Sequence, residues 1–160
     1  MNNSRASLAC LSALTLLAAA PARADEPMPI KALDVSPGDL KWMPVAALPP
    51  GAELAIVYGT PSQPGPFAYR IKFPPNYRVP VHSHTDSRFY TYLSGTFYEA
   101  DGDKWNAATL KPYGVGAFQS YVAKTNHYGM TKDEGTIFQV HGYGPTALIY
   151  ADPAEDPRKK

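Results

Sequence analysis

The segment at residues 79–95, VPVHSHTDSRFYTYLSG, decides how the rest of the chain is interpreted. It contains His82 and His84, which are separated by one residue. In a β-strand, side chains two residues apart point to the same face. A strand over this segment therefore places two imidazoles side by side, which is half of a metal site. The other half has to come from His127 or His141, the two remaining histidines of the sequence.

The chain around this segment has the pattern of a β-protein. Its 17 prolines and 12 glycines separate short stretches that are rich in Val, Ile, Thr, Tyr and Phe. Residues 67–73 alternate apolar and polar side chains, and Ser94–Gly95 is typical of a tight hairpin turn. These features predict one all-β domain of sandwich or barrel type over residues 46–152. Residues 25–45 are expected to form an arm and an edge strand, and residues 153–160 a frayed, solvated polar tail.

Residues 1–24 are typical of a secretory signal. Arg5 gives a positively charged start, residues 8–20 form a short apolar run, and small residues favour cleavage after Ala24. The run is shorter than the roughly 20 apolar residues that span a bilayer. We therefore expect a periplasmic or secreted protein with no membrane attachment. Cleavage removes Cys10, so the mature chain has no disulfide and no catalytic thiol.

The charge balance excludes several kinds of partner. The chain has 15 Lys and Arg residues against 14 Asp and Glu residues. Loss of Arg5 and Arg23 with the signal leaves 13 basic residues, so the mature net charge is about −1. This value does not favour nucleic acid or an anionic membrane surface as a partner. Motifs for serine hydrolysis, phosphate-binding loops and dinucleotide binding are also absent. The expected partner is a small-molecule ligand.

The spacing of the histidines and glycines resembles the two-part pattern of the cupin superfamily. His82, His84 and Gly95 match the first cupin motif, and Gly116 and His127 match the second. The resemblance covers about residues 67–150 and implies an antiparallel jelly-roll β-barrel. It also implies a divalent transition metal (Fe, Mn, Ni, Cu or Zn) held by the three histidines, with His127 facing the other two across the barrel. Cupins often form homodimers through edge strands, and the arm at residues 25–45 is a candidate for that contact.

The chain departs from the pattern at Arg88, which stands where cupins commonly have a glutamate ligand. Arginine stays protonated and has no lone pair to give a metal. Three interpretations remain open. The site has three histidine ligands and open positions for water or an anionic substrate; Asp86 supplies a carboxylate from a different position; or no metal binds and Arg88 holds an anionic ligand. The second motif also departs, with Val122, Lys124 and Thr131 in place of its usual Pro, Gly and Asn.

Further candidates for substrate binding follow from strand parity. Tyr90 and Tyr92 are in phase with the two histidines and are expected to point inward, where Tyr69 and Phe118 would complete an aromatic cavity for a small planar ligand. His141 is either a hydrogen-bonding or proton-shuttling group of this pocket or a structural residue at its rim. Together with Arg88, the candidate substrate-binding residues are therefore Tyr90, Tyr92 and His141.

Two functions are consistent with these residues. The first is a metal-dependent enzyme that cleaves a small organic molecule with oxygen, a dioxygenase-like activity that the resemblance implies. The second is a non-catalytic periplasmic protein that binds or senses a small ligand, with or without metal. The absence of an obvious acid or base beside the histidines lowers the case for catalysis.

Overall fold

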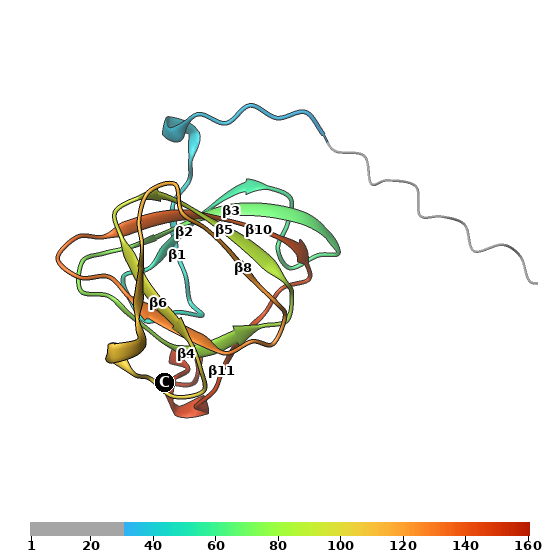
Figure 1. The fold of residues 1–160 in the computed structure, drawn as a ribbon. Coiled ribbons are helices and arrows are strands. Elements are labelled where there is room, and N and C mark those ends of the chain that lie inside the picture. Colours follow the sequence, from blue (N-terminus) through green and yellow to red (C-terminus); the bar gives the residue numbers. More distant parts are fainter. Residues whose placement is uncertain (1–30) are drawn as a thin grey trace, which may run out of the picture. The chain divides into compact units, whose positions relative to one another are not determined.

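The computed structural model describes residues 31–160, and the expected signal and the start of the arm lie outside the described residues. Two antiparallel sheets face each other (Figure 1). The six-stranded sheet has, in spatial order, β1 (Met43–Pro44), β2 (Glu53–Tyr58), β3 (Gly65–Phe73), β10 (Thr136–Gly144), β5 (Arg88–Ser94) and β8 (Phe118–Tyr121). The five-stranded sheet has β11 (Leu148–Tyr150), β4 (Arg78–His84), β9 (His127–Met130), β6 (Phe97–Asp101) and β7 (Lys111–Tyr113).

Four short 3₁₀ turns accompany the strands. They are η1 (Pro37–Asp39), η2 (Ala107–Thr109), η3 (Pro153–Glu155) and η4 (Pro157–Lys159). Within residues 31–160, no helix has the length and apolar character needed to cross a membrane. Since the described part of the chain consists of strands and short 3₁₀ turns, the all-β prediction is confirmed there.

Alternation along the strands builds the core. The inward residues of β3 are Phe67, Tyr69, Ile71 and Phe73, and each is at most 7% exposed, as their period of two predicts. Phe138 of β10 joins the two sheets. Its ring centroid lies 5.6 Å from that of Phe73 in its own sheet and 5.7 Å from that of Phe97 in the opposite sheet. Contacts between these large rings hold the two sheets together.

The turn between β5 and β6 uses a glycine for a steric reason. The expectation of a hairpin at Ser94–Gly95 is wrong, because the two strands lie in different sheets and do not pair. Gly95 has a φ of +63°, a conformation that costs little only for glycine. A Cβ at this position would also collide with the carbonyl of Gly135. Gly95 therefore sets the turn that carries the chain from one sheet to the other.

One end of the domain agrees with the sequence prediction and the other does not. Pro44 lies in β1, at the edge of the six-stranded sheet, where a residue without an N–H is tolerated. The expectation of a frayed tail is wrong. Residues 153–160 form η3 and η4, and Asp156 between them is 7% exposed. Asp152 and Asp156 cap the two turns through backbone N–H groups, which is the local reason that the tail is ordered.

Candidate metal centre

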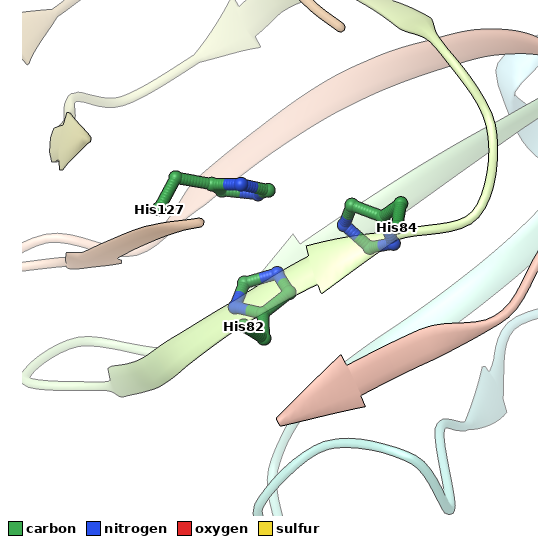
Figure 2. Close-up of side chains that lie close together, drawn as sticks. All are labelled: His82, His84 and His127. Carbon is green, nitrogen blue, oxygen red and sulfur yellow. The ribbon is translucent and has the colours of Figure 1, made fainter. Parts of the chain in front are cut away.

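Three histidines lie together on the inner face of the five-stranded sheet. His82 and His84 come from β4, and His127 comes from β9, where it pairs directly with His82. Their ligand nitrogens all lie within 4.8 Å of one another, as the close-up in Figure 2 illustrates. The expectation that His127 faces the others across the barrel is wrong, because β4 and β9 are neighbours in one sheet. Direct cross-strand pairing brings the third imidazole closer than a site across the interior would.

Backbone carbonyls fix the orientation of these rings. Nδ1 of His82 lies 2.8 Å from the Pro80 carbonyl oxygen, and Nδ1 of His127 lies 3.1 Å from that of Thr125. A carbonyl oxygen only accepts, so both Nδ1 atoms donate a proton and both Nε2 atoms keep a lone pair. His84 also bonds to the backbone, at Ala147. Outer partners of this kind are the usual way in which proteins orient histidines toward a metal.

Burial keeps the three imidazoles neutral. It lowers the pKa of His127 to about 4, although the bond to the backbone opposes the shift. Burial also lowers the pKa of His82 well below its usual value, and repulsion from His127 adds to this effect. The pKa of His84 falls for the same reason, with a further contribution from the positive charge of Arg88. Neutral imidazoles are the form that binds metal, so this donor set fits a divalent transition metal such as Zn, Cu, Ni, Fe or Mn.

Arg88 is buried in an ion pair of its own. Its side chain is 2% exposed, and Nη2 donates to Oδ1 of Asp86 at 2.6 Å. Nη1 donates to the Tyr69 hydroxyl at 3.0 Å, and Nη2 also donates to the Thr146 hydroxyl at 2.5 Å. Burial alone would lower the pKa of Arg88, but the Tyr69 and Tyr90 oxygens and Asp86 hold it above its usual value. Asp86 is therefore engaged with Arg88, and it does not belong to the group of potential metal ligands among the described residues.

This arginine cluster, consisting of Arg88, Asp86, Tyr69 and Thr146, has two unsatisfied atoms. Within the described residues, Nε of Arg88 and Oδ2 of Asp86 are buried without a hydrogen-bond partner. An unpaired buried polar atom costs about 1–3 kcal/mol. Since Arg88 lines the cavity described next, its Nε–H group is an available donor for a ligand.

The histidines open into a cavity of about 320 Å³ between the sheets. Its polar lining includes Arg88, Tyr69 and Tyr90 as well as the three imidazoles. Most of the remaining wall is apolar, including Leu48, Leu54, Ile71, Phe73, Val79 and Val140. A mostly apolar cavity with a few convergent polar groups is the usual form of a site for a small organic ligand.

Not every predicted pocket residue lines this cavity. Tyr92 is 1% exposed but lies behind the wall. Phe118 was expected inside, and this is wrong: it is 63% exposed and stacks on Phe89 at 5.8 Å on the outer face. Its neighbour along the strand, Gln119, takes the inward phase and bonds Tyr92. His141 is exposed and contacts Gln139, since the inward position on that part of β10 belongs to the preceding valine.

Sequence reasoning missed a buried carboxyl group beside the histidines. Glu99 on β6 is 2% exposed, and its Oε1 lies 4.0 Å from Nε2 of His127. Its Oε2 accepts a hydrogen bond from Tyr92 at 3.0 Å. Burial raises the pKa of Glu99 to about 8, against the opposing hydrogen bonds from Tyr92, Tyr121 and Gln119. The sequence could have revealed it, because Glu99 lies two residues after Phe97 and side chains two apart in a strand point to the same face.

A glycine makes room for this arrangement. Gly129 on β9 lies directly opposite Glu99 on β6. A Cβ at Gly129 would come within 2.5 Å of the Phe97 ring. The space over Gly129 is therefore filled by the ring of Phe97, which lies two residues before Glu99 on the same strand.

No family model and no curated protein sequence matches this chain. Solved structures do match. The polyketide cyclase RemF from Streptomyces resistomycificus is 17% identical, with 81% of this chain and 92% of that chain covered and a TM-score of 0.67. A putative acetylacetone dioxygenase from Methylibium petroleiphilum is 19% identical, with coverage of 82% and 88% and a TM-score of 0.61. An RmlC-like cupin protein from Ralstonia eutropha is 18% identical, with coverage of 79% and 76% and a TM-score of 0.60.

At these identities the likeness concerns the fold alone. The matched structures cover most of this chain, and they include cupins of the RmlC-like type as well as proteins named as enzymes. The two antiparallel sheets and their order are in accord with that architecture. The described part of this chain therefore has a jelly-roll fold like that of the matched cupin structures.

Proposed function

We propose that the protein is a metal-dependent enzyme that acts on a small organic molecule in the apolar cavity. His82, His84 and His127 hold the metal, and Glu99 is the general acid–base. One observation supports the proposal above all: a buried carboxyl group lies 4.0 Å from one of three oriented imidazoles that open into the same cavity. Glu99 is thus an acid–base group beside the histidines, which the sequence alone did not reveal.

Each part of the site has a distinct task. A divalent metal supplies Lewis-acid polarisation of a substrate oxygen. Glu99 takes or gives a proton at the substrate, and Tyr92 holds the carboxyl group in place by donating to Oε2. The Nε–H of Arg88 is available to a second oxygen of the substrate. The apolar wall excludes water, which strengthens these electrostatic interactions.

The test combines metal analysis with turnover. Wild-type protein is expected to bind about one equivalent of Fe, Mn, Ni, Cu or Zn by elemental analysis. Glu99→Gln is expected to keep the metal but lose about 10²–10⁴-fold in turnover of any substrate found in a panel of small organic acids, enolisable ketones and phenols. Glu134→Gln, on the exposed surface, is the matched control and keeps full activity. A metal-free protein that takes up none of these ions contradicts the proposal, as does full activity of Glu99→Gln.

Oxygen-dependent cleavage is a second candidate reaction. It is favoured by the composition of the ligand group, which has three neutral imidazoles and leaves other coordination positions open. The similarity to a putative acetylacetone dioxygenase makes acetylacetone a sensible member of the panel. Oxygen uptake in proportion to substrate loss supports this reaction, and turnover without oxygen uptake excludes it. Tight binding without turnover would instead support the non-catalytic binding or sensing role.

Export is part of the proposed function. The sequence of residues 1–24 supports a cleaved signal and therefore a periplasmic or secreted enzyme. Intact-mass analysis of protein purified from the periplasm is expected to find a chain that begins at Asp25. A chain that keeps its N-terminal residues and stays in the cytoplasm contradicts this part of the proposal.

A further inference from the structure

The ordered tail, residues 152–160, packs against the strand that carries two of the histidines. Glu155 forms an ion pair with Arg78 of β4 at 2.8 Å. The Arg78 guanidinium in turn lies 4.3 Å from the ring centroid of Trp105. In Figure 1 the end of the chain lies beside β4 and β11. The tail is thus held against the five-stranded sheet through Arg78, which also contacts Trp105 of the loop that follows β6.

Arg158 brings a guanidinium from this tail to the cavity wall. Its Nε and Nη2 donate to both carboxylate oxygens of Asp156, at 2.7 and 2.8 Å. Nη2 also donates to the backbone carbonyl of Leu148 at 3.1 Å. These three bonds fix the plane of the guanidinium and leave the Nη1 N–H groups for other acceptors. Arg158 lines the cavity although its side chain is 41% exposed, so it lies at the mouth.

The position of Arg158 relative to the histidines is set by the β11–β4 ladder. Leu148, which accepts from Arg158, is the direct cross-strand partner of His84. Since neighbouring strands lie about 4.8 Å apart, the guanidinium is on the order of 10 Å from the histidines. The rest of the cavity wall is largely apolar, with Leu48, Leu54 and Leu148 among its residues. Such a cavity suits a ligand with a polar group at each end and an apolar body.

We propose that Arg158 is a specificity-determining residue that binds a carboxylate at the outer end of the substrate, while the inner end reaches the histidines. The substrate is then a small organic acid with an apolar body. Asp156 pairs with one edge of the guanidinium and orients it, and the two Nη1 N–H groups are the donors for the substrate carboxylate. The identity of the inner end rests on the proposed function, but the recognition of a carboxylate by Arg158 does not.

The experiment uses hydroxamic acids as probes, because a hydroxamate binds divalent metals and anchors the inner end. Each probe carries a terminal carboxylate on an alkyl chain of increasing length and is paired with its terminal carboxamide. By calorimetry on metal-loaded protein, at least one chain length is expected to bind about tenfold more tightly as the carboxylate. In Arg158→Met this preference is expected to disappear, while affinity for the carboxamide changes less than about twofold. The control Lys159→Met removes an adjacent positive charge and is expected to keep the preference.

A second variant guards against loss of the tail structure. Arg158→Met leaves Asp156 without its partner, whereas the double variant Asp156→Asn, Arg158→Gln replaces the ion pair with a neutral hydrogen-bonding pair. Both variants carry the same expected loss of preference. A carboxylate preference that survives in both, or that is absent from wild-type protein at every chain length, overturns the assignment.

A second experiment, on metal-free protein, distinguishes failure of this inference from failure of the proposed function. If elemental analysis finds that the protein takes up no metal, the proposed function fails and the hydroxamates lose their anchor. Linear alkanoates and the matching alkanamides are then compared on the metal-free protein by ligand-observed NMR. A preference for alkanoates that depends on Arg158 supports the inference by itself. Equal binding of acids and amides, or no binding of either, overturns it.

Discussion

Two polar clusters are buried beside the same cavity, and they meet the cost of burial in opposite ways. In the histidine cluster, His82, His84 and His127 become neutral, donate to backbone carbonyls and keep lone pairs free. In the arginine cluster, Arg88 keeps its charge and is compensated by Asp86 and two hydroxyl groups. The histidines therefore keep lone pairs that can bind a metal, whereas most of the N–H donors of Arg88 are already used within its cluster.

The comparison explains how an arginine can be buried beside three potential metal ligands. An unpaired guanidinium there would repel a cation, but the Arg88–Asp86 pair carries no net charge. The remaining field of Arg88 helps to keep His84 neutral. A carboxyl group is still present near the histidines, because Glu99 enters from a different strand.

The largest effect is expected from removing one member of the arginine cluster. Arg88→Met leaves Asp86 buried without a counter-charge, which typically costs about 3–5 kcal/mol of unfolding free energy. Urea denaturation of the metal-free protein measures this loss. Arg70→Met, which removes a partly exposed arginine bonded to Gln139, is the control and is expected to cost much less. A loss for Arg88→Met as small as that of the control would mean that the cluster is not the compensated unit described above.

The histidine cluster is expected to lose stability in acid when it holds no metal. The pKa of His127 is about 4 in the folded protein and about 6.5 in the unfolded chain, so the unfolded state binds the proton first. The contribution of His127 to stability is then complete above about pH 6.5 and falls by roughly 3 kcal/mol as the pH drops toward 4. Denaturation of wild type and His127→Gln across this range isolates the contribution. Parallel pH profiles for the two proteins would contradict the prediction.

Metal affinity separates the histidine cluster from other histidines of the chain. His127→Ala removes one of three donors and is expected to lower metal affinity by about 100-fold or more, since even outer-partner mutations cost 10–100-fold. Titration with Zn²⁺ or Ni²⁺ in competition with a chelating dye gives the value. His141→Ala, on an exposed part of β10, is the matched control and should leave affinity unchanged. Equal affinities for the two variants would exclude His127 as a ligand.

The smallest effect is expected at the hydroxyl that bridges the arginine cluster. Thr146 accepts from Arg88 and donates to Asp86. Thr146→Val keeps the shape but removes both bonds, with an expected cost of about 1–2 kcal/mol. Thr60→Val on the exposed surface should change stability by less than about 0.5 kcal/mol. If Thr146→Val matched the surface control, the hydroxyl would not contribute to the cluster.

Local patterns were sufficient for part of this site. A period of two places His82 and His84 on one face of β4, and the same parity puts Tyr90 and Tyr92 inside. Phe118 was predicted to point inward, but in β8 the neighbouring Gln119 points inward and Phe118 is exposed. Glu99 was detectable by the same logic, from its phase with Phe97, but an acidic residue in a strand is more often exposed.

Residues 79–95 on their own specify a strand with two imidazoles on one side, because alternation is a property of the local backbone. The partners of these residues depend on pairing between distant segments. The register of β4 against β9 sets His127 opposite His82, and the return of the chain brings Thr146 to Arg88 across 58 residues. The packing of the tail that brings Arg158 to the cavity is equally non-local. Register and packing are collective results of the whole core, so folding in three dimensions decides which polar groups meet.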